Sequence, residues 1–195
     1  VQLAFLFVVV GFGTKAGLAP LHTWLPDAHS QAPTPVSAML SGVLLPCAIY
    51  GIARVQAIVA GTLGSEFPGL ILIVFGTLSA AVAVPFVLIQ HDLKRLLAYS
   101  SIEHVGIIIV AIGIGGPAAL FGGLLHLVAH AVTKAMLFFA AGSIVQRYGT
   151  TNMARIAGTG RADRVSERAG IGPRAAVGQS RGAGFRKARG PLRRG

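Results

Sequence analysis

An unbroken run of 24 uncharged residues, from Phe67 to Gln90, constrains this chain more than any other feature. A helix that crosses a lipid bilayer needs about 20 mostly apolar residues, and this run is long enough to do so. Only 12% of all residues are charged, whereas a soluble domain usually carries roughly a quarter. We therefore expect an all-α membrane protein.

Four further segments are long and apolar enough to pack beside this helix. They cover residues 1–25, 36–53, 96–114 and 118–146. Pro20 lies within the first segment and is expected to break its helix, because proline removes a backbone donor. Such breaks persist in lipid only where neighbouring protein satisfies the freed backbone groups. The sequence thus predicts a bundle of about five transmembrane helices with a broken first helix.

The net charge of +11 is concentrated near the C-terminus. Residues 155–195 carry eleven Lys or Arg and two acids, whereas residues 1–154 carry six basic and four acidic residues. We expect a partial helix bundle over 1–154 and a basic, Gly/Arg-rich tail over 155–195, either disordered or out of frame. The tail could be a basic arm that binds anionic lipid headgroups, or wrong-frame sequence that begins near residue 155. No specific nucleic-acid binding is expected.

Basic residues also predict the orientation. Five spans would put the loop at 26–35, the loop at 91–95 and the tail on one side, together with Lys94, Arg95 and Arg147. Lys and Arg accumulate in cytoplasmic loops, so we expect these segments to face the cytoplasm from a multi-pass protein of the cell inner membrane. Because Val1 begins inside an apolar run with no signal peptide before it, the chain is interpreted as a fragment.

Three ionisable residues, His126, His130 and Lys134, recur every four positions in the last apolar segment. Each step of four advances about 40° around a helix, so all three lie on one face. An ionised lysine near the bilayer centre costs about 2.5–3.5 kcal/mol and normally faces the bundle interior. Since histidine titrates near neutral pH, the pattern favours a proton relay. A zinc site is the alternative, although no third ligand lies nearby.

Lys15 is the second strong candidate, because it lies beside the expected helix break and broken helices next to buried charges recur in transporters. His22, Glu103 and His104 are secondary relay candidates. His22 and His29 flank the membrane boundary, where an interfacial role is the alternative. Because Glu103 and His104 are adjacent, they cannot share one helical face; one is expected to point inward and the other toward a partner helix.

Redox chemistry within the chain is not expected. Cys47 is the only cysteine, which excludes an internal disulfide or a cysteine-based cluster. The sequence contains no CxxC pair, no phosphate-binding glycine loop and no flavin motif. We therefore expect no cofactor and no metal, and any enzymatic label would belong to a larger complex.

Residues 13–29 resemble the lysine-bearing broken helix of the proton-antiporter-like membrane subunits. This family occurs in complex I, in membrane-bound hydrogenases such as hydrogenase-4 and formate hydrogenlyase, and in multisubunit sodium/proton antiporters. Residues 32–38, residues 91–101 and the three-residue stripe are similar to further blocks of the family, so the resemblance covers residues 1 to about 154. The Glu103–His104 pair looks more like the hydrogenase-linked branch.

The resemblance implies roles for particular residues. Lys15 would be the central protonatable lysine, and His126, His130 and Lys134 would form the relay that links the half-channels. Many relatives carry a relay His or Lys on the helix after Lys15, whereas this sequence offers Ser41 and Pro46 at the corresponding places.

Three function classes stay open. The chain could belong to a subunit that couples remote redox chemistry, of an NADH-quinone oxidoreductase or a hydrogenase, to proton transport. It could instead belong to a stand-alone cation/proton antiporter, or be an inert fragment inserted in the membrane. The expected partners are other membrane subunits, the lipid bilayer, and protons, with sodium as the alternative ion.

Overall fold

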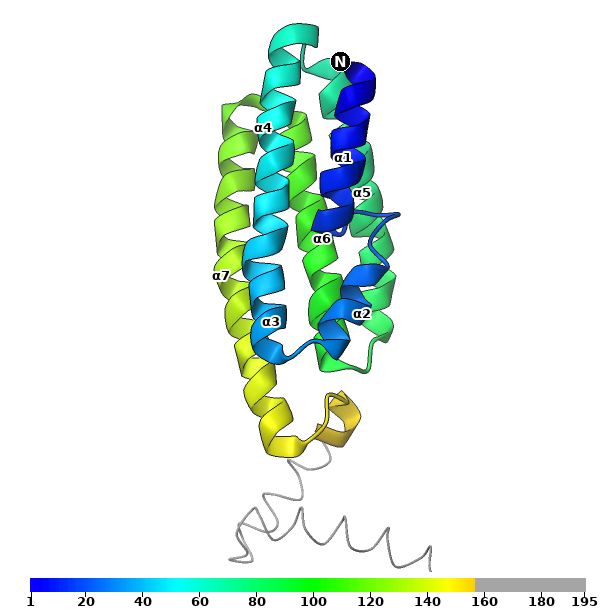
Figure 1. The fold of residues 1–195 in the computed structure, drawn as a ribbon, viewed down its shortest axis with the longest axis vertical. Coiled ribbons are helices and arrows are strands. Elements are labelled where there is room, and N and C mark those ends of the chain that lie inside the picture. Colours follow the sequence, from blue (N-terminus) through cyan, green and yellow to red (C-terminus); the bar gives the residue numbers. More distant parts are fainter. Residues whose placement is uncertain (157–195) are drawn as a thin grey trace, which may run out of the picture. The chain divides into compact units, whose positions relative to one another are not determined.

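A computed structural model of the chain describes residues 1–156, in which all regular secondary structure is helical. Figure 1 shows the helices running side by side as a bundle. Their order is α1 (Gln2–Ala16), α2 (Trp24–Gln31), α3 (Thr34–Met39), the π-helical turn η1 (Leu40–Leu44), α4 (Leu45–Leu63), α5 (Glu66–Ile89), α6 (Leu93–Ile114) and α7 (Gly116–Tyr148).

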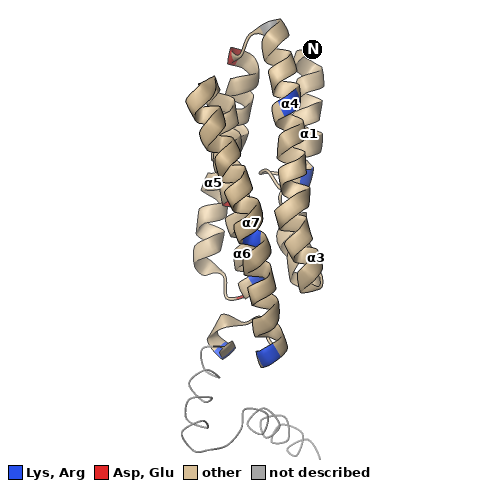
Figure 2. Ribbon diagram, turned by 90° about the vertical axis from the view of Figure 1, so that its left-hand side faces the viewer, with Lys and Arg blue, Asp and Glu red and all other residues tan. Residues whose placement is uncertain are grey.

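Among residues 1–156, four helices are long and apolar enough to cross a membrane: Thr34–Thr62, Glu66–Ile89, Leu93–Ile114 and Gly116–Tyr148. The first of them combines α3, η1 and α4. The shorter α1 and α2 form the broken first helix that the sequence predicts, so the expected all-α membrane bundle is confirmed. Figure 2 shows how few Lys, Arg, Asp and Glu residues the bundle carries.

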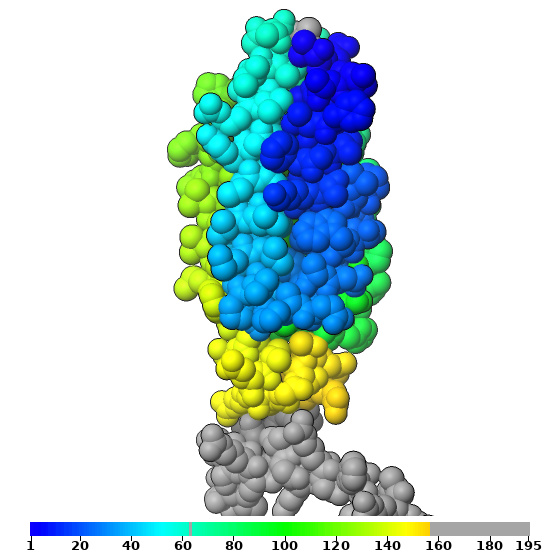
Figure 3. Space-filling view, viewed as in Figure 1, coloured from blue at the N-terminus to red at the C-terminus, as the bar shows by residue number. Residues whose placement is uncertain are grey.

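The outer faces of the helices are apolar. Large exposed side chains include Phe7 on α1, Leu70 on α5, and Phe121 and Met136 on α7. Figure 3 shows α1 and α4 covering one face of the bundle side by side. Because lipid tails replace water around such a protein, apolar residues on the outside are the pattern that a bilayer requires.

The first helix breaks at Gly17 rather than at Pro20. Gly17 adopts φ 76°, in the left-handed region, and a Cβ there would lie 2.8 Å from Leu25. The N–H of Gly17 donates to the carbonyl of Thr14 and that of Leu18 to the carbonyl of Gly13, which is the Schellman ending of a helix. Pro20 follows in the turn, so proline does not itself end α1.

Neighbouring helices satisfy the polar groups that the break leaves free. The indole Nε1 of Trp24 donates to the carbonyl of Thr14 at 2.7 Å. The backbone N–H of Ala19 donates to Ser79 Oγ on α5 at 2.8 Å. Unpaired backbone groups are costly in a bilayer, so these bonds allow the break to lie within the bundle.

Helices α5 and α6 approach each other closely at two pairs of glycines. A Cβ on Gly76 would lie 2.6 Å from the carbonyl oxygen of Gly106, and a Cβ on Gly69 would lie 2.6 Å from that of Gly113. Small residues let membrane helices pack backbone to backbone. These contacts fix how α6 is rotated, and therefore which of its side chains face α7.

We expect Gly76→Ala to destabilise the bundle, because the added methyl group meets backbone that cannot move aside. Overpacking of this kind costs about 1–3 kcal/mol, and thermal unfolding of the purified protein in detergent measures it. Gly122→Ala on α7 is the matched control, since a Cβ there meets nothing within 4 Å. Equal melting temperatures for the two variants would contradict the close packing.

One end of the bundle brings together three segments far apart in the sequence. Lys94 Nζ donates to the carbonyl of Ala32 at 2.9 Å. The backbone N–H of Leu93 donates to the carbonyl of Thr151 at 2.9 Å. The loops before α3 and α6 and the end of α7 therefore lie on one side, as Figure 1 shows. The predicted loop at 26–35 is largely helical, because α2 extends to Gln31 and α3 begins at Thr34. Which side of the membrane this end faces stays a prediction.

A second unit of the chain begins at Asn152. Its described part reaches residue 156, and the side chain of Asn152 accepts a hydrogen bond from the N–H of Ala154 at 3.0 Å. Residues 157–195, with most of the expected basic tail, lie outside the described residues. The expectation that the tail is disordered or out of frame stays a prediction.

Candidate functional site

Two antiparallel helices, α6 and α7, present their polar side chains to each other. The α7 series of His126, His130 and Lys134 faces α6, where Ser100 and His104 are also four residues apart. His104 lies opposite the two histidines and Ser100 lies opposite Lys134. The result is one line of ionisable and hydroxyl groups between two membrane-spanning helices.

His104 joins the line through a direct hydrogen bond. Its Nδ1 lies 3.1 Å from Nε2 of His126, and its ring centroid lies 5.8 Å from that of His130. Of the adjacent pair Glu103 and His104, it is therefore His104 that faces α7. A hydrogen bond between two imidazoles can carry a proton in either direction, depending on which ring holds it.

His130 is buried between the helices, with 5% of its surface exposed. Neither of its ring nitrogens has a hydrogen-bond partner among the described residues. Buried polar groups are normally hydrogen-bonded to protein or to ordered water, so an exception calls for an explanation. His130 lies between His126 and Lys134 in the α7 series, and its ring packs against that of His104.

Lys134 is buried even more completely, with 3% of its surface exposed. Its ammonium donates to the carbonyl of Leu97 at 3.2 Å and forms a short hydrogen bond with the hydroxyl of Ser100. Glu103 is close enough to act on Lys134 electrostatically. The described residues place no carboxylate in salt-bridge contact with Lys134.

The membrane-spanning helix formed by α3 and α4 contains a π-helical turn, η1, just before Pro46. Ser41 in this turn is fully buried, and its Oγ lies 3.1 Å from Ser101 Oγ on α6. π-turns inside α-helices often occur at functional sites. At the place where relatives are expected to hold a relay His or Lys, this chain therefore has a pair of hydroxyl groups next to Ser100.

The structure does not bring every candidate residue into this line. Lys15, in the last turn of α1, is exposed and has no partner among the described residues. His22 lies in the turn after the break, half-buried, with its Nδ1 unpaired. Glu103 is half-buried beside His104.

Two residues near the site carry signals that the sequence showed only weakly. Ser100 lies four residues before His104, so the same periodicity that finds the α7 stripe also places it on the inner face of α6. His29, for which an interfacial role was the alternative, is fully buried against Phe138 of α7. Its position beside a proline-rich loop gave no indication of burial.

The Asp92 region also differs from the surface ion cluster that its charges suggest. Asp92 caps α6 by accepting hydrogen bonds from the backbone N–H groups of Lys94 and Arg95, at 2.9 and 3.0 Å. The Arg95 side chain pairs instead with Asp27 of α2, at 2.6 Å. These interactions tie α2 to the start of α6.

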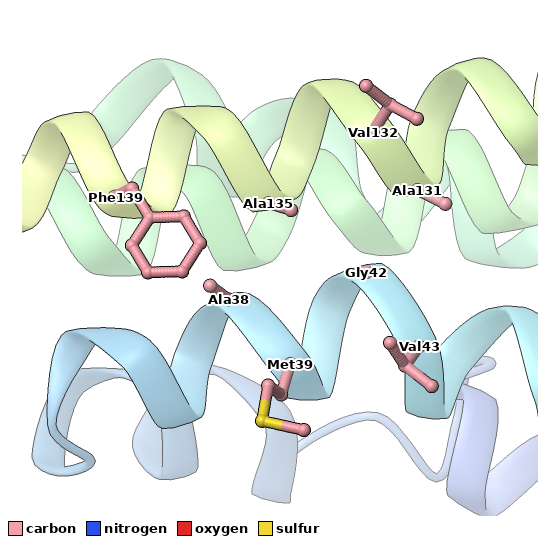
Figure 4. Close-up of a pocket in the computed structure, with 8 residues that line it drawn as sticks. All are labelled: Ala38, Met39, Gly42, Val43, Ala131, Val132, Ala135 and Phe139. Carbon is pink, nitrogen blue, oxygen red and sulfur yellow. The ribbon is translucent and has the colours of Figure 1, made fainter.

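A groove of about 270 Å³ lies between η1 and α7, on the other side of α7 from the polar line. Its walls are apolar and include Met39, Val43, Ala135 and Phe139, as Figure 4 shows. Because no polar side chain lines it, this groove offers no path for an ion. The described residues also contain no cluster of three or more His, Cys, Asp or Glu able to hold a metal, so the zinc alternative gains no support.

Ionisable side chains that face the interior of a membrane bundle mark ion pathways and proton relays. Fold and site together define the class of multi-pass membrane proteins that contain a buried ionisable path. The chain belongs to the family described as NADH:quinone oxidoreductase/Mrp antiporter, TM, whose model matches residues 1–166.

Individual relatives agree with this assignment. The hydrogenase-4 component F homolog of Methylacidiphilum infernorum is 47% identical over 158 residues, which cover 81% of this chain and 33% of that protein. A chain in the structure of the membrane-bound sulfane sulfur reductase, an archaeal respiratory membrane complex, matches with a TM-score of 0.75 and 32% identity, over 80% of this chain and 32% of that one.

A chain of the Mrp complex from Dietzia sp. DQ12-45-1b matches with a TM-score of 0.73 and 30% identity, over 78% of this chain and 28% of that one. The chain thus spans about a third or less of the proteins it resembles.

Proposed function

We propose that this chain is part of a proton-translocating membrane subunit, and that the line of residues between α6 and α7 carries the protons. The observation that supports this most is the burial of Lys134 beside a hydroxyl and a carbonyl group, next to the buried His130. Among residues 1–156, no carboxylate is in salt-bridge contact with the lysine. A structural lysine would be stabilised by an ion pair, whereas a lysine that exchanges protons needs acceptors that do not hold its charge permanently.

The proposed order of groups is His126, His104, His130 and Lys134. His126 and His104 exchange a proton through their hydrogen bond, and His130 receives it across the short gap between the rings. Lys134 takes it next and is held in place by Leu97 and Ser100. Each imidazole can accept a proton at one nitrogen and release one from the other.

Lys15 is proposed as a second protonatable lysine, acting with protein that covers the exposed end of α1. A charged side chain that faced lipid there would be costly, so we infer that other segments or subunits pack against it. Coupling of such a lysine to remote redox chemistry is supported by the names of relatives, which include hydrogenase-4 components and an NADH-quinone oxidoreductase subunit N.

A cation/proton antiporter is the second candidate, supported by the similarity to a chain of the Mrp complex. The two functions differ in what drives transport. In proteoliposomes that contain the native assembly, a redox-coupled subunit acidifies or alkalises the lumen when an electron donor and acceptor are added. An antiporter does so when a sodium gradient is imposed. An inert fragment responds to neither, which would sink the proposal.

We also propose that the bundle end holding Lys94, Arg95 and Arg147 faces the cytoplasm, because Lys and Arg accumulate on that side. In a Cys47→Ala background, Gln31→Cys is expected to resist an impermeant maleimide added to intact cells. Ser65→Cys, at the opposite end of the bundle, is expected to react. Both positions are exposed, so the opposite labelling pattern would reverse the orientation.

A further inference from the structure

The polar series on α7 ends at Lys134, because the next residue at four-residue spacing is Phe138. His29 of α2 lies against Phe138 at this point. The two ring centroids are 4.7 Å apart and the ring planes are inclined by 16°. The imidazole of His29, on α2, therefore lies beside the first apolar residue that follows the polar series on α7.

His29 is fully buried, with 0% of its surface exposed, and neither ring nitrogen has a hydrogen-bond partner among the described residues. A residue needed only for stacking on Phe138 would not require these two nitrogens, since an apolar ring would fill the same space without the cost of burying them unpaired. The presence of a titratable ring here is thus unexplained by packing.

Two lysines from other helices interact with His29. Lys134 of α7 and Lys94 of α6 both act on it electrostatically. Lys94 Nζ donates to the carbonyl of Ala32, at the C-terminal end of α2. At the same end of the bundle, Asp27 of α2 pairs with Arg95 at the exposed surface. His29 therefore contacts α7 one helical turn after Lys134 and interacts with Lys94, which lies at the end of the bundle.

We propose that His29 is a proton-carrying residue that connects Lys134 with the end of the bundle where Lys94 lies. In one transfer, the Lys134 ammonium gives up a proton and becomes neutral, and one nitrogen of the His29 ring gains it. The other ring nitrogen then releases its proton toward the bundle end, and the ring returns to the neutral state as the other tautomer. This inference rests on the proposed transport function.

The test compares transport by the native assembly carrying His29→Phe, reconstituted in proteoliposomes with a pH-sensitive dye inside. Phenylalanine keeps the stacking on Phe138 but cannot carry a proton. We expect the rate to fall at least tenfold while the amount of assembled subunit stays unchanged. His91→Phe is the matched control, because His91 is exposed at the same end of the bundle, and it is expected to transport normally.

A second variant separates proton transfer from packing. His29→Ala leaves space near Phe138, and added imidazole is expected to restore part of its lost rate, whereas a purely structural defect would not respond to a small proton carrier. A rate within twofold of wild type for His29→Phe overturns the proposal. Failure of both variants to accumulate in the membrane also overturns it, since His29 would then be a structural residue.

The outcome also distinguishes this inference from the proposed function. If wild type transports protons, Lys134→Met does not, and His29→Phe does, His29 lies off the path while the proposed function stands. If the wild-type assembly moves no protons under any driving force, the proposed function itself fails.

Discussion

Replacing Lys134 with methionine is expected to abolish most proton transport while the chain still inserts and assembles. Methionine has a similar length but no ionisable group, so the line between α6 and α7 loses the ammonium that donates to Ser100. Removing a buried charge relieves a desolvation cost, which for a lysine near the bilayer centre is about 2.5–3.5 kcal/mol. Assembly should therefore be unchanged or improved.

The measurement is the rate of the change in pH inside proteoliposomes, normalised to the amount of assembled subunit. Lys134→Arg should fail as well, because an arginine keeps its proton at any physiological pH. Val132→Met is the matched control, since Val132 is on the same helix but 57% exposed on its outer face. Full transport by Lys134→Met in a normal assembly would show that the stripe is merely structural.

Lys15→Met is expected to behave like Lys134→Met.

The transmembrane helices and the α7 stripe could be predicted from the sequence, because both depend on local patterns. The apolar run at 67–90 becomes α5 almost residue for residue. The four-residue spacing of His126, His130 and Lys134 fixes one face, and the cost of exposing a charge to lipid turns that face inward. Neither inference requires knowledge of which helices are neighbours.

The pairing across helices could not be predicted in this way. Which of Glu103 and His104 faces α7 depends on the rotation of α6, and that rotation is set by its glycine contact with α5, Gly106 against Gly76. The burial of His29 likewise depends on how the short α2 packs against α7. The rotation of α6 and the packing of α2 follow from tertiary contacts, which the periodicity of a single sequence does not predict.

The break in the first helix was predicted at the right segment with the wrong residue as its cause. Proline disfavours helix interiors more strongly than glycine does, so the sequence predicts Pro20 as the residue that breaks the helix. Gly17 nevertheless ends α1 earlier, because only glycine fits its left-handed conformation against Leu25. Lys15 is therefore in the last turn of an intact helix, before the break.

The second large effect concerns the hydrogen-bonded pair His104 and His126. We expect His104→Phe and His126→Phe each to lower proton transport at least tenfold, because phenylalanine fills the space of the ring without carrying a proton. If both residues belong to one path in series, the first block already stops the flow. The double variant should then be no slower than the slower single variant.

A comparison of the wild type with these three variants tests whether one continuous path between α6 and α7 carries the protons. Transport is measured in proteoliposomes for the wild type, both single variants and the double variant, each normalised to assembled subunit. We expect the double variant to transport at the rate of the slower single variant. Losses that multiply, or single variants that transport like wild type, would contradict it.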